Sequence, residues 1–346
     1  MNKQVSVLAV IAILAVGLGV WLSQSHSEDE FEAGLLFDDL QKFANQVDRI
    51  EINNAQGVLL SAQKLGDGWM ATFDPEQDVY PISQVKLAVF IETMMRATLV
   101  EPKTRKPQKY VRLGLQSIDI EDSMANLVTF KASKSSWQVL VGNKVKIGEG
   151  HYILKPDDSR SWRTNKTINL PLNKFSWLKQ PILPYQTQDI SSISRLDNSG
   201  WQIAKSARGD FYLIDMPKDK ELKYSSILNS MVSSLTSLDF EELFAVEKAA
   251  SDEDFTQSLK ILTQLEVSTT DDKIFQVIVS KLDDKHFVNF SSKGQSEYWQ
   301  NWYYQVSNFS AQQLIKTLDD FLIQQSNTTN NSDSRPAMGE EGYSPH

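Results

Sequence analysis

The sequence contains an internal repeat, and this repeat constrains the fold more strongly than any other feature. Residues 50–57, IEINNAQG, align with residues 193–200, ISRLDNSG, because both combine a strand pattern with a turn. Two further pairs of segments follow in the same order, namely residues 129–142 with residues 268–281, and Trp162 with Trp302. Similarity that keeps one order along the chain predicts two tandem copies of a single folding unit.

Each copy combines short strand patterns with a helix. In the first copy, alternating apolar residues between turn signals predict strands over residues 49–52, 58–64, 69–73, 127–132, 137–141, 151–154 and 161–163. Apolar residues three and four apart from Leu36 onward predict an amphipathic helix that leads into the strand at residue 49, and a second helix is predicted after Pro81. A short helix is expected within residues 171–184. The apolar face predicted for the helix after Pro81 consists of Val85, Ala88, Val89, Ile91, Met94 and Met95.

A second constraint is the uncharged stretch VSVLAVIAILAVGLGVWL, which begins with Val5 and ends with Leu22. As a helix it would be roughly 27 Å long, close to the hydrocarbon thickness of a bilayer. No small-x-small cleavage signal follows, which favours an uncleaved signal anchor over a secretory signal peptide. Lys3 precedes the stretch and an acidic segment follows it, so the chain is expected to cross the inner membrane once, with its C-terminal bulk in the periplasm.

Together these patterns predict an α+β fold. A single N-terminal transmembrane helix would be followed by two tandem modules of antiparallel strand meanders with packed helices. The expected divisions are residues 1–30 for the membrane anchor and acidic spacer, 31–185 and 186–325 for the two modules, and 326–346 for a disordered tail with almost no apolar content.

Composition and motifs exclude several classes of function. The net charge of −9 argues against nucleic-acid binding, which needs a basic face. The chain has no Cys, so it lacks disulfides and thiolate chemistry, and its 4 His residues do not form the spaced pairs typical of metal sites. No phosphate loop, dinucleotide fingerprint or nucleophile elbow occurs. We therefore expect no enzyme activity, no metal and no cofactor.

A basic segment stands out in this acidic chain, and it contains Lys103, Arg105, Lys106, Lys109 and Arg112. A solvated loop is the ordinary explanation of such a cluster. The functional alternative is a docking strip for an acidic partner or for lipid headgroups.

An aromatic segment, SEYWQNWYYQV, offers a second candidate contact. Aromatic side chains at this density can stack on a sugar or anchor a protein partner. Trp302 is expected to be a core residue because of its repeat counterpart Trp162, whereas Tyr298 and Trp299 are the candidates for ligand or partner contact, with Trp299 expected at the surface.

The first half of the chain resembles a known family. Behind the apolar stretch, Gly114-Leu115 precedes a strand ending in Leu140-Val141-Gly142, then follow Gly150 and Tyr152, and Trp177-Leu178 closes the module. This order is similar to that of a bacterial membrane-anchored family of unknown function with repeated α/β modules, related to accessory proteins of gliding-motility-type ABC transporters. The resemblance implies a fold and an association with an exporter, but no site residue.

The leading hypothesis is therefore a non-enzymatic, membrane-anchored extracytoplasmic accessory or scaffold protein of an ABC-type export complex. The alternative is a module that binds carbohydrate or another envelope component through an aromatic platform around Trp299. A hydrolase with an unrecognised site is the least favoured hypothesis.

Overall fold

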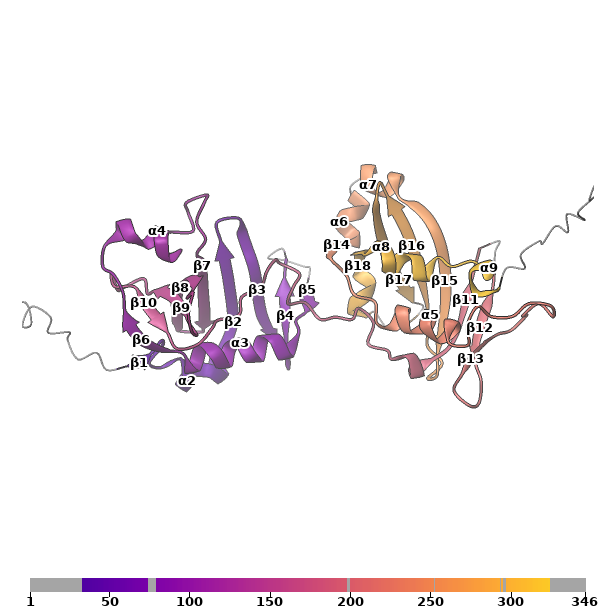
Figure 1. Ribbon diagram of the computed structural model, residues 1–346, viewed down its shortest axis with the longest axis horizontal. Coiled ribbons are helices and arrows are strands. Elements are labelled where there is room, and N and C mark those ends of the chain that lie inside the picture. Colours follow the sequence, from indigo (N-terminus) through magenta and orange to yellow (C-terminus); the bar gives the residue numbers. More distant parts are fainter. Residues whose placement is uncertain are drawn as a thin grey trace, which may run out of the picture. The chain divides into compact units, whose positions relative to one another are not determined.

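The computed structural model describes residues 33–73, 79–197, 200–251, 253–292, 294 and 297–323. The chain divides between Gln180 and Pro181 into two compact units, called unit 1 and unit 2 here (Figure 1). The sequence patterns placed this division between residues 185 and 186. Residues 5–22 and 326–346, the predicted membrane segment and tail, lie outside the described residues.

The described strands of unit 1 form one antiparallel sheet in the order β1-β6-β10-β9-β8-β7-β2-β3-β4-β5. Their bounds are β1 (Gly34–Leu35), β2 (Val47–Asn54), β3 (Gly57–Leu65), β4 (Gly68–Thr72), β5 (Val79–Pro81), β6 (Thr98–Pro102), β7 (Asn126–Ala132), β8 (Ser135–Lys144), β9 (His151–Leu154) and β10 (Trp162–Thr164). The helices of this unit are α2 (Leu40–Phe43), α3 (Gln84–Arg96) and α4 (Tyr110–Leu113), with 3₁₀ turns η1 (Ala44–Gln46) and η2 (Pro107–Lys109).

The described strands of unit 2 form a second antiparallel sheet in the order β13-β12-β11-β15-β16-β17-β18-β14. Their bounds are β11 (Ile190–Arg195), β12 (Gln202–Lys205), β13 (Phe211–Leu213), β14 (Glu242–Ala245), β15 (Lys260–Thr269), β16 (Ile274–Leu282), β17 (Lys285–Ser292) and β18 (Trp302–Val306). The helices are α5 (Ile227–Thr236), α6 (Val246–Ser251), α7 (Glu253–Ser258), α8 (Asn308–Leu314) and α9 (Leu318–Phe321), with 3₁₀ turns η3 (Thr187–Asp189) and η4 (Tyr298–Asn301).

The two sheets share one strand order. Reading β6-β10-β9-β8-β7-β2-β3-β4 in unit 1 against β14-β18-β17-β16-β15-β11-β12-β13 in unit 2 pairs the strands in their order along the chain. The hairpins β7-β8 and β15-β16 contain the two segments that align in sequence, and Trp162 and Trp302 each begin a corresponding strand, β10 and β18. The internal repeat is therefore present as a repeated sheet topology.

The predicted α+β class is wrong, because the fold consists mostly of antiparallel sheet. The amphipathic helix expected before the strand at residue 49 is reduced to α2 and η1, and the strand itself is present as β2. Residues 171–184, where a short helix was expected, form turns and bends. Even α3 extends over only 13 residues, and no helix in the described ranges is long and apolar enough to cross a membrane. The predicted transmembrane helix has no counterpart among these elements.

Helices cover one face of each sheet, and α3 lies across the sheet of unit 1 (Figure 1). Its buried residues are Leu87, Phe90 and Met94, and the ring of Phe90 stacks on Phe130 of β7 with a centroid distance of 5.8 Å. Of the face predicted from sequence only Met94 is buried, while Val85 and Val89 are 74% and 49% exposed. The buried face of α3 is thus rotated around the helix axis relative to the predicted face, and it carries bulkier side chains.

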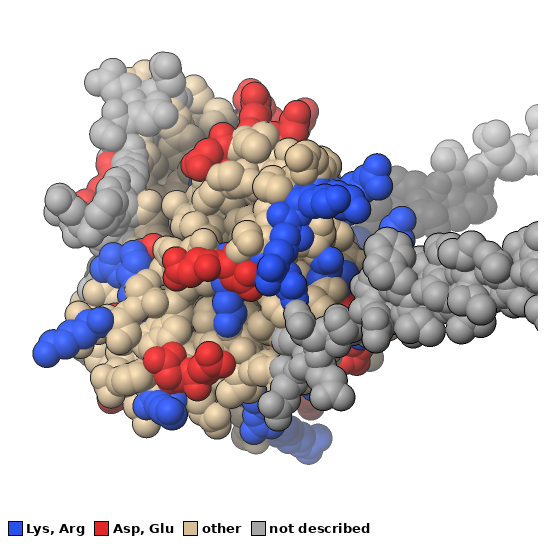
Figure 2. Space-filling model, turned by 90° about the vertical axis from the view of Figure 1, so that its left-hand side faces the viewer, with Lys and Arg blue, Asp and Glu red and all other residues tan. Residues whose placement is uncertain are grey.

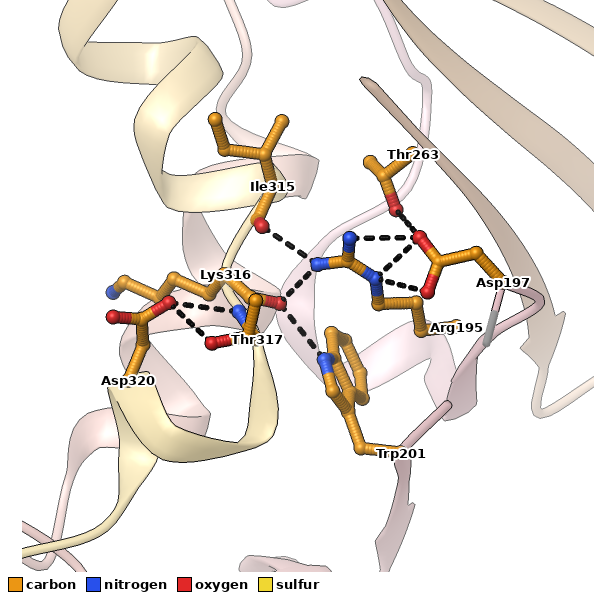
Figure 3. A network of polar contacts seen from close by, with 8 residues as sticks. All are labelled: Arg195, Asp197, Trp201, Thr263, Ile315, Lys316, Thr317 and Asp320. Carbon is orange, nitrogen blue, oxygen red and sulfur yellow. Dashed lines mark hydrogen bonds and ion pairs between the residues drawn. The ribbon is translucent and has the colours of Figure 1, made fainter. Parts of the chain in front are cut away.

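A network of hydrogen bonds connects residues 315–316, near the end of the described part of unit 2, to β11 of its sheet (Figure 3). Arg195 at the end of β11 donates through Nη1 to the carbonyl oxygens of Ile315 and Lys316, at 2.6 and 2.7 Å, and through Nε to both carboxylate oxygens of Asp197. The indole N–H of Trp201 donates to the same Lys316 carbonyl at 2.8 Å. The connection between α8 and α9 is therefore fixed by side chains from the opposite end of the unit's sequence.

Candidate functional site

The sequence singled out five basic residues, Lys103, Arg105, Lys106, Lys109 and Arg112, and the last four of these are exposed. The side chain of Lys103 is 27% exposed. We call these five residues the basic strip. The strip follows β6 and continues through η2 into α4, where Pro107 begins the 3₁₀ turn and supplies no backbone donor. Figure 2 views the end of unit 1 that carries these elements, and it shows a band of basic side chains with acidic side chains beside it.

The backbone of the basic strip is held against the loop before β10. The Lys103 N–H donates to the Ser161 carbonyl at 2.8 Å, and the Ser161 N–H donates to the Thr104 carbonyl at 2.9 Å. Ser161 is fully buried, and its hydroxyl donates to the same Thr104 carbonyl. Further along, the Tyr110 hydroxyl donates to the carbonyl of Ser159. Hydrogen bonds therefore hold the backbone that carries the cations, while the side chains of Arg105, Lys106, Lys109 and Arg112 are exposed.

Two glycines allow α4 to sit close to β8. Gly114 ends α4 in the left-handed conformation, with φ of 67°, and a Cβ there would lie 2.5 Å from Oδ1 of Asn143. A Cβ on Gly142 would lie 2.4 Å from the carbonyl oxygen of Leu113. Only glycine fits where two backbones approach this closely. The Gly-Leu and Val-Gly motifs of the family resemblance are therefore structural, because they set the position of the basic strip.

Most of the strip is not neutralised by neighbouring acids. Lys103 pairs with Glu101, but none of Arg105, Lys106, Lys109 and Arg112 forms an ion pair with another residue in the described part of the chain. These four cations remain available to an acidic partner.

The charge of Asp158 interacts with that of Arg105 in the basic strip. Partial burial alone would raise the pKa of the Asp158 carboxyl group, but the hydrogen bond from the Trp162 indole, the backbone N–H of Arg160 and the positive charges of Arg105 and Arg160 together lower that pKa from its ordinary value. The Asp158 carboxylate accepts from the indole of Trp162 at 2.8 Å. Asp158 thus holds the loop before β10, and of the strip's cations its charge interacts with Arg105.

The aromatic candidates Tyr298 and Trp299 do not form an exposed platform. Trp299 is 1% exposed and packs edge-to-face against Phe275 and Phe290, so the expectation that it lies at the surface is wrong. The hydroxyl of Tyr298 donates to the Ile182 carbonyl at 2.8 Å, and burial, followed by the charge of Glu297, raises its pKa to about 12. The core role predicted for Trp302 is confirmed, since it is 3% exposed.

Trp299 nevertheless lines a cavity of about 630 Å³ in unit 2. Tyr185, Glu266 and Lys273 also line it, and sequence reasoning missed all three. They come from the start of unit 2, from β15 and from the turn before β16, so no single stretch of sequence signals the site.

The buried histidines have structural roles. Nδ1 of His151 accepts a hydrogen bond from the backbone N–H of Ile168 at 3.0 Å, and burial, followed by the charge of Lys144, lowers the pKa of its imidazole. Burial also lowers the pKa of His286, with Lys281 adding to the effect. Within the described ranges, no group of three or more His, Cys, Asp or Glu side chains could hold a metal ion.

One family matches this chain. Residues 74–258 match a family described as Domain of unknown function (DUF4340). The matched range includes α3, the basic strip and Arg195, and it ends with α7. No curated protein and no solved structure matches the chain.

Proposed function

The chain belongs to the DUF4340 family of domains of unknown function, and we propose that it is a non-enzymatic accessory protein that docks on an acidic surface of a protein partner. The observation that carries the proposal is the basic strip, whose four exposed cations form no ion pair with any residue that the structure describes. Its backbone is held by Ser161 and by the two close-packed glycines. Complementary charge steers association and selects the partner, more than it adds raw affinity.

The charge of the rest of the chain supports an acidic protein partner over lipid headgroups. With a net charge of −9, the protein as a whole is repelled by an anionic membrane surface, and only the local field of the strip is attractive. A protein partner can present acidic groups to the strip alone, whereas a lipid surface would face the neighbouring carboxylates as well. Figure 2 shows such acidic side chains beside the basic band.

The finer part of the proposal concerns location and partner. We place the protein at the inner membrane with its bulk in the periplasm, beside an ABC-type exporter. The support is the apolar stretch from Val5 to Leu22, the acidic residues that follow it, and the resemblance of the first half of the sequence to exporter accessory proteins. An accessory role needs no catalytic group, only a scaffold that positions the basic strip.

Reversal of the strip's charge tests the docking proposal. The triple variant Lys106→Glu, Lys109→Glu and Arg112→Glu is compared with a matched variant in which Lys42, Lys64 and Lys134, three exposed lysines of unit 1, are changed to Glu. Both variants change the net charge equally. If each strip cation contributes about 0.5 kcal/mol, the first variant should lose at least about tenfold in partner recovery, and the control should lose little.

Recovery is measured after in-cell crosslinking of the full-length protein, mild detergent extraction and quantitative mass spectrometry. Recovery of permease and ATPase subunits, reduced by the strip variant alone and by added salt, is the expected result. Equal recovery of the same partners with both triple variants would contradict docking through the strip. Recovery of partners with no relation to a transporter would keep the docking proposal and contradict the exporter.

A further inference from the structure

The strand β13 forms one edge of the sheet in unit 2 (Figure 1). Its counterpart in the repeat, β4, is covered by β5, in which Tyr80 is fully buried. No strand that the structure describes covers β13 in this way. We propose that the open edge of β13 pairs with β13 of a second copy of the chain, in an antiparallel, two-fold symmetric pair centred on Tyr212. The proposal does not depend on docking through the basic strip, because β13 belongs to unit 2.

The sequence explains why unit 2 has no counterpart of β5. In unit 1, the Lys179 N–H donates to the carbonyl of Pro81, the last residue of β5, at 2.8 Å. The same bond occurs in unit 2, where the Ile323 N–H donates to the Glu221 carbonyl at 2.8 Å. This correspondence aligns the sequence VYP of β5 with DKE at residues 219–221. Because charged side chains are costly to bury, these residues cannot replace the buried tyrosine of β5, and the edge of β13 stays open.

The hydrogen bonds between β12 and β13 determine which backbone groups point outward. The Ile214 N–H donates to the Gln202 carbonyl at 2.9 Å, so Ile214 faces β12. In an antiparallel pair the residues that face the neighbouring strand alternate with residues that face away from it. Tyr212 therefore also faces β12, while the N–H and C=O groups of Phe211 and Leu213 point away from it.

These outward groups are complementary to those of a second copy. Within the described ranges, the Leu213 N–H and the carbonyls of Phe211 and Leu213 form no hydrogen bond outside the β12–β13 ladder. The Phe211 N–H donates to Oδ1 of the exposed Asn229 at 3.3 Å, and the Leu213 carbonyl of the second copy would replace this acceptor. Because the outward groups flank Tyr212 symmetrically, Phe211 of each copy lies opposite Leu213 of the other, as a two-fold interface requires.

The strand β13 also lacks the features that protect sheet edges from pairing. Edge strands are commonly very short or carry charged residues or proline. The edge strand β1 has 2 residues, β5 ends with Pro81 and β14 begins with Glu242, whereas β13 has the sequence FYL. On its outer face Tyr212 and Ile214 are 49% and 38% exposed. In the pair, Tyr212 would lie opposite its symmetry mate and within reach of the second Ile214.

Disulfide trapping of the full-length protein in mild detergent tests the pair. The chain has no Cys, so each single-cysteine variant carries one thiol. Residues opposite each other at a position without direct hydrogen bonds have Cα atoms about 4.5 Å apart, which suits a disulfide. Tyr212→Cys should therefore form a disulfide-linked dimer under mild oxidation, even if so small an interface is weak. The control Tyr224→Cys, at a tyrosine of the same unit that is 50% exposed, should form a dimer more slowly.

Two further variants test the register and the pairing without a covalent bond. In the proposed pair the two copies of residue 214 lie roughly 14 Å apart along the strands, so Ile214→Cys should form a dimer no faster than the control. Tyr212→Glu places two like charges opposite each other and should raise the dissociation constant of the dimer by about tenfold in sedimentation velocity. Its matched control, Tyr224→Glu, should leave the dissociation constant unchanged.

Three results would each overturn the proposal. The first is dimer formation by Tyr212→Cys that is no faster than that by Tyr224→Cys. The second is faster dimer formation by Ile214→Cys than by Tyr212→Cys, which would mean a different contact between the copies. The third is a dissociation constant that Tyr212→Glu and Tyr224→Glu change equally.

Discussion

Arg195 shows how much of unit 2 depends on one side chain. Its side chain is 7% exposed, and its guanidinium group contacts the Asp197 carboxylate and the carbonyl oxygens of Ile315 and Lys316 (Figure 3). A buried charge that has lost its hydration is tolerated only when such oxygens replace the water. The partner carbonyls lie 120 and 121 residues further along the chain, which is why no local pattern in the sequence marks Arg195 as important.

The substitution Arg195→Met should therefore lower the free energy of unfolding of unit 2 by about 3 kcal/mol, the lower end of the range for breaking a buried ion pair, because Asp197 keeps some contact with water. Urea unfolding, followed at the transition of unit 2, measures the change. Arg208→Met, at an exposed position in the same unit, is the control and should change the stability by less than about 0.5 kcal/mol. Equal effects of the two substitutions would show that the network does not stabilise the unit.

The two candidate sites differ in how well they could be predicted from the sequence. The basic strip is contiguous in sequence, so its exposure and shared location could be anticipated from composition alone. The cavity combines Tyr185 with Glu266, Lys273 and Trp299, which are brought together only by the sheet. The sequence identified Trp299 as a notable residue, yet its burial depends on Phe275 and Phe290 from two different strands and could not be predicted from its neighbours.

Strands of unit 1 were more predictable than its helices, for a physical reason. Turn residues such as Gly57 and Gly66 have positive φ angles, and the turns between β2, β3 and β4 lie where the sequence predicts turns. By contrast, apolar residues spaced three and four apart from Leu36 to Ile50 led us to predict one helix before the strand, and this helix is largely absent. Leu36, Leu40 and Ile50 are buried, but a short helix, a 3₁₀ turn and a strand together reproduce the spacing expected of one helix.

The helix α3 carries apolar residues on more than one side, so its periodicity alone could not select the buried face. The structure predicts that Phe90→Ala will lower the free energy of unfolding of unit 1 by about 3–5 kcal/mol, because it leaves a cavity between Phe130 and Trp177. Val89→Ala, a truncation at the preceding residue, is the matched control. It should alter stability by less than about 0.5 kcal/mol, because Val89 is 49% exposed and alanine favours the helix.

Thermal and urea unfolding of both variants measure these differences. The face predicted from sequence gives the opposite order, with Val89→Ala as the damaging change. A larger loss for Val89→Ala than for Phe90→Ala would therefore contradict the burial described for α3.

On the scale of the whole chain, the repeat explains why one strand order occurs twice. The two copies share turns and the order of their elements, while their core residues differ: Phe130 and Phe90 stack in unit 1, whereas Phe275, Phe290 and Trp299 cluster in unit 2. The same topology can be filled by different apolar side chains as long as the pattern of inward-facing residues is kept.

Because each sheet and each core belongs to a single unit, we expect residues 33–180 and residues 181–323 to fold as separate fragments. Each fragment should show dispersed amide NMR signals and a cooperative urea transition, and the second should retain the cavity beside Trp299. A fragment of residues 33–132 is the control, since it ends with β7 and removes β8, β9 and β10, leaving a central strand without its partner. The control should fail to unfold cooperatively. Loss of cooperative unfolding in either complete unit would contradict two independent cores and would mean that the repeat is stable only as a pair.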